Sequence, residues 1–289
     1  MAMERTGLVN ALSFDIEDWF HMVEVDAVSD PEEWPSLPTI VERHTDWIVE
    51  TVTAAKVRAT FFVLGWIAER HPAMVRRIAE AGHELATHSH WHRKVYELDP
   101  ESFREDMRRS IDAIESASGA KVRGFRAPSF SITPGTEWAF DVLHDLGLSY
   151  DASLFPTARG HGGYPCPLEA HPFTAAPSGR PMPELPMSVM SIGGKRVAFS
   201  GGGYMRLFPE WLIRRGFEQL HRAGRPVVVY LHPRDFAPEC PRVPMPLKRR
   251  FKCYVGLGSA QRKLRMLLDR YRFDTCAAVL GLERQADAA

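Results

Sequence analysis

The sequence predicts an α/β fold of the (β/α) barrel type, in which a parallel sheet lies inside and helices lie around it. Strand-like and helix-like segments alternate repeatedly along the chain, which is the pattern of parallel strands joined by helices. The chain has 289 residues, 45% of them hydrophobic, so it can bury a core of the size that one barrel domain needs. In addition, charged and polar side chains follow the ends of several strands, and such ends form the rim of a barrel where active sites assemble.

Local sequence patterns predict the individual strands and helices. Short apolar runs, such as residues 8–14 and 225–231, indicate buried strands. Apolar residues at helical spacing indicate helices, and Gly82, Gly119 and Gly147 mark the ends of three of them, since glycine commonly stops a helix. The expected strands are residues 8–14, 59–64, 83–87, 122–126, 148–151 and 225–231, and the expected helices are residues 38–56, 67–81, 100–118, 138–146, 209–223 and 259–271.

Two proline-rich stretches interrupt this alternation. Residues 156–186 hold eight of the 22 prolines, and we expect long surface loops there that face the substrate. Residues 237–246 form a second proline-rich loop. We therefore divide the chain into a barrel domain, residues 1–236, and a C-terminal extension, residues 237–289, which packs on the barrel as a cap.

The charge balance excludes several classes of partner. Lysine plus arginine and aspartate plus glutamate both number 36, so the formal net charge is zero and no global field attracts nucleic acid. Two short basic runs, residues 248–250 and 262–265, are interpreted as solvated helix faces, with a local anionic partner as the alternative. No run of about 18 apolar residues is present, so we expect no membrane span.

The expected location is the cytoplasm. Residues 1–10 lack the basic segment and the apolar run of a signal peptide. The four cysteines are scattered without a CxxC pair, which favours reduced thiols over a disulfide framework. No oligomeric state follows from these features.

The most informative motif is a pair of histidines with an acidic run upstream. His88 and His92 are four residues apart, so one helical turn would place both imidazoles on the same face. Two imidazoles and one carboxylate suit Zn²⁺ or a similar divalent metal, with one position open for water. Strand alternation places Asp15 and Glu17 on one face, so Glu17 is the favoured carboxylate and Asp18 the alternative. The competing interpretation is a partly buried polar turn.

Four candidate catalytic side chains accompany the histidine pair. Asp15, Arg126, Asp151 and His232 each fall at the end of a predicted strand. In a barrel these positions converge on one rim, which favours a metal-dependent hydrolytic site. Each also has an ordinary structural explanation: a helix cap, a surface ion pair, a turn residue and a buried core histidine, respectively.

These residues resemble the five motifs of the polysaccharide deacetylase family, also known as the NodB-homology enzymes or carbohydrate esterase family 4. The resemblance covers roughly residues 8–235, with the motifs in the family's order. The first motif departs from the common form, since the acids run Asp-x-Glu-Asp instead of two adjacent aspartates, and the fourth lacks a tryptophan after its aspartate. The motifs are Phe14–Asp18, His88–His92, Arg126–Phe130, Asp151–Leu154 and Leu231–Pro233.

A finer resemblance is to bacterial deacetylases encoded with exopolysaccharide export and exosortase systems. The shared features are residues 10–15, the loop Gly201–Tyr204 and a tail from Arg250 to Phe273. The family resemblance implies a distorted (β/α) barrel of about seven parallel strands. It also implies hydrolysis of the N-acetyl group of an amino sugar in a polysaccharide, an oligosaccharide or a lipid-linked precursor.

The resemblance implies a role for each group. A divalent metal, Zn²⁺ or else Co²⁺, Ni²⁺ or Fe²⁺, would be held by the two motif histidines and one carboxylate and would act as a Lewis acid. Asp15 would be the general base, oriented by Arg126, and a backbone N–H near residues 126–130 would help to stabilise the oxyanion. His232 would protonate the sugar nitrogen as general acid, and Asp151 would keep its imidazole protonated.

Two other functions compete with this one. Amidohydrolases of the same fold act on small non-sugar amides, such as a ureide or a cyclic imide; a closed pocket would favour that function and an open cleft a glycan. A carbohydrate-binding module without catalysis is disfavoured, because both metal histidines, the candidate acid and the candidate base are present.

Overall fold

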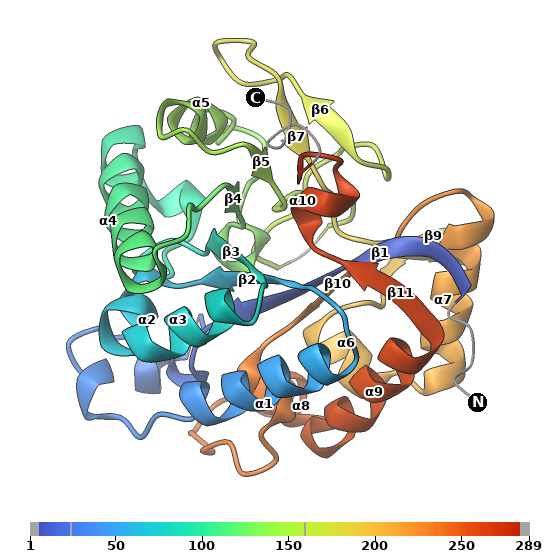
Figure 1. The fold of residues 1–289 in the computed structure, drawn as a ribbon. Coiled ribbons are helices and arrows are strands. Elements are labelled where there is room, and N and C mark those ends of the chain that lie inside the picture. The colour runs from blue at the N-terminus through green and yellow to red at the C-terminus, as the bar shows by residue number, and fades with distance from the viewer. Residues whose placement is uncertain (1–5, 24, 159, 284–289) are drawn as a thin grey trace.

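The computed structural model describes residues 6–23, 25–158 and 160–283. Seven parallel strands form a continuous sheet that curls around the barrel interior, and no described pairing joins its two outer edges (Figure 1). The expectation of a distorted (β/α) barrel of about seven parallel strands is therefore confirmed. In spatial order the seven strands are β10 (Val228–Leu231), β1 (Thr6–Ile16), β2 (Thr60–Val63), β3 (Glu84–Thr87), β4 (Gly124–Phe125), β5 (Tyr150–Asp151) and β7 (Met182–Glu184).

Helices surround this sheet, as the alternation of segments predicted (Figure 1). The long helices begin and end close to the expected positions. For example, α4 (Pro100–Ser118) starts after the capping side chain of Asp99 and stops at Gly119, whose left-handed φ of 72° ends the helix. The others are α1 (Val41–Ala54), α2 (Gly65–Arg70), α3 (Pro72–Glu80), α5 (Trp138–Asp145), α6 (Gly202–Leu207), α7 (Glu210–Arg222), α8 (Leu247–Tyr254), α9 (Ala260–Arg270) and α10 (Cys276–Val279).

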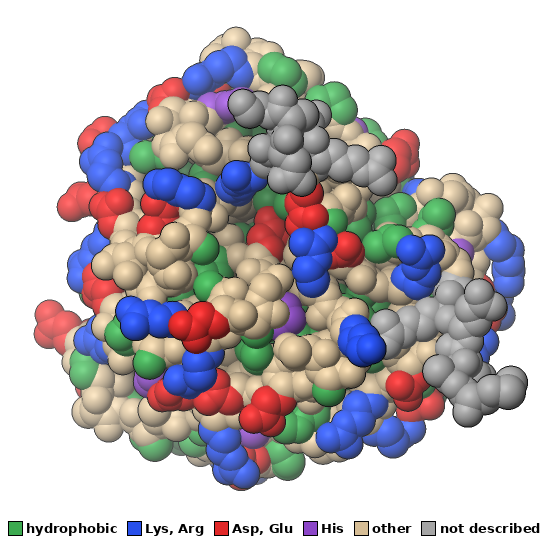
Figure 2. Space-filling model, in the orientation of Figure 1, with side chains coloured by type: hydrophobic (Ala, Val, Ile, Leu, Met, Phe, Trp, Pro, Cys, Tyr) green, Lys and Arg blue, Asp and Glu red, His purple; other side chains and the backbone are tan. Residues whose placement is uncertain are grey.

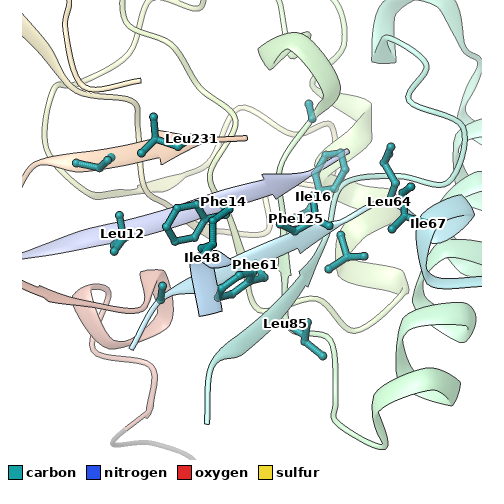
Figure 3. Close-up of a cluster of buried hydrophobic side chains, with 14 of the residues drawn as sticks. Leu12, Phe14, Ile16, Ile48, Phe61, Leu64, Ile67, Leu85, Phe125 and Leu231 are labelled. Atoms are coloured by element: carbon teal, nitrogen blue, oxygen red, sulfur yellow. The ribbon is translucent and has the colours of Figure 1, made fainter. Parts of the chain in front are cut away.

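Strand β1 has two faces with different roles. Its outward side chains are apolar and pack with side chains of α1 and β2 in the main core (Figure 3). Its inward side chains Ser13 and Asp15 both accept hydrogen bonds from Arg126 in the barrel interior. Because side chains alternate across a strand, the apolar residues that build the core also fix the direction of the acid. The outward set includes Leu12, Phe14 and Ile16 of β1, Ile48 of α1 and Phe61 of β2.

The single helix expected over residues 67–81 is wrong in one respect, since the structure has two helices there. α2 ends at Arg70 and α3 starts at Pro72, with His71 between them at φ −125° and ψ 51°. A proline disfavours the α conformation of the residue before it, and it is well suited to the first position of the next helix. The apolar spacing continues across this break, which is why periodicity alone did not reveal it.

The proline-rich stretch 156–186 is also more regular than expected. It contains a short antiparallel pair, β6 (His171–Phe173) with β7, at the edge of the sheet. Pro172 and Pro183 lie opposite each other in this pair. Antiparallel strands contain residue pairs that exchange no hydrogen bonds, and such a pair tolerates proline, which has no N–H to donate. A second hairpin, β8 (Val189–Ile192) and β9 (Lys195–Ala198), follows it and was not predicted either.

The C-terminal segment contributes to the central sheet. Strand β11 (Tyr271–Asp274) runs parallel to the first half of β1, whereas β2 pairs with its second half. The segment therefore does more than cap the fold, because it supplies a strand that pairs with β1. The division at residues 236 and 237 stays a prediction.

The distribution of charge on the surface and the hydropathy of the helices agree with the expectations from composition. Figure 2 shows basic and acidic side chains interspersed over the face in view, as expected for a chain with no formal net charge. Within the described part of the chain, no helix has both the length and the hydropathy needed to cross a membrane.

Candidate active site

The carboxyl end of β1 brings two acids to the site. Arg126 donates from Nη1 to Asp15 Oδ1 at 2.7 Å, and both side chains are buried. His232 follows β10, the neighbouring strand, and its Nε2 lies 3.8 Å from Asp15 Oδ2 and 3.8 Å from Glu17 Oε1. Asp15 and Glu17 thus lie on the same side of the chain, as strand alternation predicted.

The imidazole of His88 is held in one tautomer. His88 follows β3, and its Nδ1 lies 2.8 Å from the carbonyl oxygen of Arg126, which can only accept a hydrogen bond. Nδ1 therefore carries the proton, and Nε2 keeps a lone pair. Burial lowers the pKa of His88 to about 4, so the ring is neutral near pH 7 and is suited to bind a cation.

The turn that joins the two motif histidines is not helical, which corrects the sequence-based geometry. Ser89 and His92 have left-handed φ values of 68° and 55°. The carboxylate of Asp106 accepts the backbone N–H groups of His90 at 2.7 Å and Trp91 at 3.2 Å, which stabilises this irregular turn. The two imidazoles still converge, with ring centroids 5.2 Å apart. Asp106 of α4, rather than helical spacing, therefore stabilises the turn in which the two imidazoles converge.

Glu17, His88 and His92 form a group that fits a divalent metal. One ligand atom from each lies within 4.8 Å of the others, and Glu17 Oε2 is 2.8 Å from His92 Nε2. Burial raises the pKa of Glu17, but the surrounding histidines together lower it well below its ordinary range, so this carboxylate is ionised. Two imidazoles and one buried carboxylate are a common zinc ligand set in hydrolases.

Asp18, the alternative ligand, points elsewhere. Its carboxylate accepts the backbone N–H groups of Trp19, Ile40 and Val41, together with the hydroxyl of Thr39. It therefore caps both the short turn after β1 and the N-terminus of α1, where negative charge is favourable. The structure does not bring Asp18 to the metal-binding group, and the alternative assignment is corrected in favour of Glu17.

The variant Asp18→Ala, compared with Glu17→Gln, tests which of the two acids binds the metal. Because it leaves several buried N–H groups without an acceptor, we expect the free energy of unfolding of the metal-free protein to fall by about 3 kcal/mol. Zinc bound at saturation should stay unchanged, whereas Glu17→Gln should lose zinc with little change in stability. Denaturant unfolding and metal analysis test this; zinc loss in Asp18→Ala at unchanged stability would restore Asp18 as the ligand.

The carboxylate beside His232 is Asp235, not Asp151 as the sequence suggested. His232 Nδ1 lies 3.0 Å from Asp235 Oδ2, three residues later in a turn that begins with Pro233. Although burial alone would raise the pKa of Asp235, its arginine and histidine neighbours lower it to about 2. One of them, Arg206, places Nε 2.8 Å from Asp235 Oδ1.

Asp151 lies deeper and supports the segment that carries Arg126. Its carboxylate accepts from the hydroxyl of Ser153 at 2.6 Å, and this hydroxyl accepts the N–H of Ala127 at 2.8 Å. Asp151 also shares a hydrogen bond with Glu184, whose pKa is raised well above its ordinary range by burial and by the charge of Asp151. Asp151 therefore positions the backbone next to Arg126 and does not contact His232.

Asp235 and His21 are not among the site residues predicted from the sequence. His21 Nδ1 accepts the backbone N–H of Asp18 at 2.9 Å, so its proton lies on Nε2 and the ring cannot serve as a metal ligand. In both cases a local signal was present. His21 and Asp235 each lie three residues after a candidate site residue, Asp18 and His232, which is the spacing of a capping box.

The site opens into a cavity of about 720 Å³, within the usual size range of ligand sites. Its base holds Asp15, His232 and the metal-binding group, and its wall includes Gly202 and Gly203 at the start of α6. Two glycines of the loop Gly201–Tyr204 therefore lie at the site. Of the described residues in the stretch 156–186, Gly160 and His161 line the cavity, so this stretch faces it only in part.

Two family models match consecutive parts of the chain. The family model described as polysaccharide deacetylase matches residues 33–150. Over these residues, the chain is similar to the polysaccharide deacetylase family. A second model, described as a domain of unknown function (DUF3473), matches residues 152–281, so the deacetylase family model ends before His232 and the second model contains it.

Individual curated proteins are similar to parts of this chain. A chitooligosaccharide deacetylase from Rhizobium leguminosarum bv. trifolii is 37% identical over 73 residues, which are 25% of this chain and 34% of that protein. A peptidoglycan-N-acetylglucosamine deacetylase from Bacillus cereus is 25% identical over 119 residues, which are 37% of this chain and 43% of that protein. The chain thus spans less than half the length of the curated relatives it matches.

A solved structure extends the likeness to the complete fold. A putative polysaccharide deacetylase from Mycobacterium smegmatis superimposes with a TM-score of 0.65 at 19% sequence identity. The match covers 98% of this chain and 96% of that one. At this identity the likeness concerns the fold alone, and it includes the C-terminal segment with β11.

Proposed function

We propose that this protein is a metal-dependent hydrolase that removes the N-acetyl group of an amino sugar and releases acetate. The observation that carries the proposal is the convergence, at the base of one cavity, of Asp15, His232 and the Glu17–His88–His92 group. The names of the relatives, which are deacetylases of chitooligosaccharide and peptidoglycan, support the same reaction class.

In this proposal Asp15 is the general base. Its Oδ1 is occupied by Arg126, whereas Oδ2 lies toward His232 and the cavity. A carboxylate fixed by a buried guanidinium keeps one oxygen available to take a proton from the attacking water. When bound by Glu17, His88 and His92, a divalent cation would supply Lewis acidity, which polarises a carbonyl group and lowers the pKa of water. We propose Zn²⁺ for this position, with Co²⁺, Ni²⁺ or Fe²⁺ as alternatives.

The tetrahedral intermediate requires a donor for its oxyanion, and one backbone group is suited to provide it. Within residues 126–130, Arg126, Ala127 and Phe130 donate their N–H groups to other protein oxygens, and Pro128 has none. The remaining N–H belongs to Ser129, which lines the cavity at a left-handed φ of 55°. We assign the oxyanion contact to this group.

His232 is the proposed general acid for the departing amine. Burial lowers the pKa of His232, but its hydrogen bond to Asp235 and the nearby carboxylates together raise it above the ordinary value. The imidazolium therefore persists to higher pH and can protonate the sugar nitrogen as the C–N bond breaks.

Asp235→Asn should change the pH profile in a defined direction. Without the negative charge the imidazolium of His232 loses its proton at lower pH, so the alkaline limb of kcat/KM should move to lower pH. The rate near neutral pH should fall by about tenfold to a hundredfold, as for other residues that orient a catalytic group. Asp151→Asn is the matched control and should leave this limb in place; the opposite result would return the supporting role to Asp151.

An acetate-release assay tests the function itself. The substrates are a panel of N-acetylated oligosaccharides and small amides, assayed with and without a chelator. We expect acetate from the glycans, loss of release with the chelator and recovery with added zinc. Release from ureides or cyclic imides alone would favour the small-amide function, and metal-independent release would contradict the mechanism. The exposed rim residues Tyr204, Leu207 and Phe251 favour the glycan, since they leave the cavity open to solvent.

A further inference from the structure

Helix α8 exposes large apolar side chains to solvent. Leu247 is 81% exposed and Phe251 is 57% exposed, and the two are one turn apart on the same face. Amphipathic helices of globular proteins normally turn such a face toward the core. In α8 the buried residue is Tyr254, and the Leu247–Phe251 face has no protein layer over it within the described chain.

The same helix is strongly basic. Its eight residues, LKRRFKCY, include Lys248, Arg249, Arg250 and Lys252 and no acid. Three of these four side chains are exposed, and Arg249 is half-buried. A chain without formal net charge therefore concentrates positive charge around two exposed apolar side chains.

This surface lies at the mouth of the proposed active site. Lys248, Phe251 and Lys252 line the cavity together with the two exposed large side chains of α6, Tyr204 and Leu207. The two α6 side chains are 38% and 47% exposed, respectively, so the apolar character continues across the opening. We refer to α8 together with Tyr204 and Leu207 as the docking surface.

The docking surface is fixed to the catalytic groups by arginines. Arg206 donates to the backbone oxygens of Lys252, Cys253 and Val255 at 2.9–3.1 Å, which satisfies the carbonyl groups at the end of α8. Arg234 donates to the Cys253 oxygen as well, at 2.9 Å. Because Arg206 also pairs with the carboxylate that supports His232, a single side chain connects this surface to the proposed general acid.

We propose that the docking surface binds an anionic membrane and that the substrate is a lipid-linked amino sugar presented at that membrane; the second part rests on the proposed deacetylase function. Apolar side chains surrounded by lysine and arginine are the features by which short helices lie in the headgroup region of a bilayer. A polyanionic glycan would explain the basic residues but not the exposed Leu247 and Phe251. A second copy of the chain would bring two basic helices into contact, which repulsion disfavours.

Vesicle sedimentation tests the docking surface. The full chain should bind vesicles of phosphatidylcholine mixed with phosphatidylglycerol, should bind phosphatidylcholine alone much more weakly, and should be released by high salt. Leu247→Ser/Arg250→Gln changes two residues of α8 that do not line the cavity. We expect this variant to bind the anionic vesicles at least about tenfold more weakly, since it removes one apolar and one basic contact.

A matched control is available on the β8–β9 hairpin, where Ile192 and Lys195 are both exposed. Ile192→Ser/Lys195→Gln should bind vesicles like the unchanged chain, and equal weakening in both variants would overturn the docking surface. Absence of binding to anionic vesicles would overturn it as well. So would binding of polygalacturonate in place of vesicles, or a dimer that only the α8 variant dissociates.

The docking surface and the proposed function on which the second part rests fail in distinguishable ways. Vesicle binding does not require turnover, and Leu247→Ser/Arg250→Gln should hydrolyse a short soluble N-acetylated oligosaccharide at the normal rate. A chain that binds vesicles but hydrolyses no N-acetylated amine would leave the docking surface intact and refute the proposed function. A chain that hydrolyses soluble substrate but ignores anionic vesicles would refute the docking surface alone.

Discussion

His88→Ala is expected to remove the bound metal and reduce acetate release to near background. The substitution deletes one of the three proposed ligands and leaves only Glu17 and His92 to hold a cation. Mutation of a residue that only hydrogen-bonds to a metal ligand typically lowers metal affinity by about tenfold to a hundredfold. Loss of a ligand itself should therefore weaken zinc binding by more than about a hundredfold. Metal analysis after dialysis, together with acetate release at saturating substrate, measures both effects.

His90→Ala is the matched control for this prediction. His90 lies in the same turn, but its ring points away from the metal-binding group, toward Gly65 and Glu69 of α2. Its removal should therefore leave zinc content unchanged, although the cavity it creates should lower the free energy of unfolding by roughly 2 kcal/mol. If both alanine variants lose zinc to the same extent, the loss reflects a damaged turn and the ligand assignment of His88 fails.

The parts of the site that could be predicted are those fixed by strand ends. His88, Arg126 and His232 each follow a strand of the parallel sheet, and Asp15 is the penultimate residue of β1. Parallel strands place their carboxyl ends at one rim whatever the loops do. The short range of this argument also explains the Glu17 prediction, because alternation over two residues needs no knowledge of the rest of the fold.

The partner of His232 could not be predicted in the same way. Asp151 ends β5 and His232 follows β10, but these two strands are separated by four others in the sheet. The supporting acid instead comes from the same short turn as His232, at Asp235. The position at the rim therefore predicted which residues lie near the site. Which of these residues contact each other depends on how far apart their strands lie around the barrel.

The elements that were missed depend on contacts between distant residues. Strand β11 has only four residues. It becomes a strand because β1 is long enough to pair with β11 through its first half and with β2 through its second half. The edge pair of β6 and β7 likewise exists because β5 offers an open edge. Neither signal is present in the local pattern, where proline and short length argue against a strand.

Asp15→Asn should separate catalysis from metal binding. Asparagine has nearly the same shape and can still accept a hydrogen bond from Arg126, but it cannot take a proton from water. We expect kcat to fall by about a thousandfold, within the range for loss of a general base, while KM changes little. Zinc content should stay at the unchanged level, because Glu17, His88 and His92 remain in place.

The variant also has a cost in stability that must be measured beside its rate. Arg126 is fully buried, and Asp15 is the carboxylate with which it forms an ion pair. Removing the negative charge leaves a buried cation without its partner, so the free energy of unfolding should fall by about 3 kcal/mol or more. A folded, zinc-loaded and inactive Asp15→Asn protein would support the general base. Zinc loss equal to that of His88→Ala would instead make Asp15 a metal ligand, and the base would then have to be sought elsewhere in the cavity.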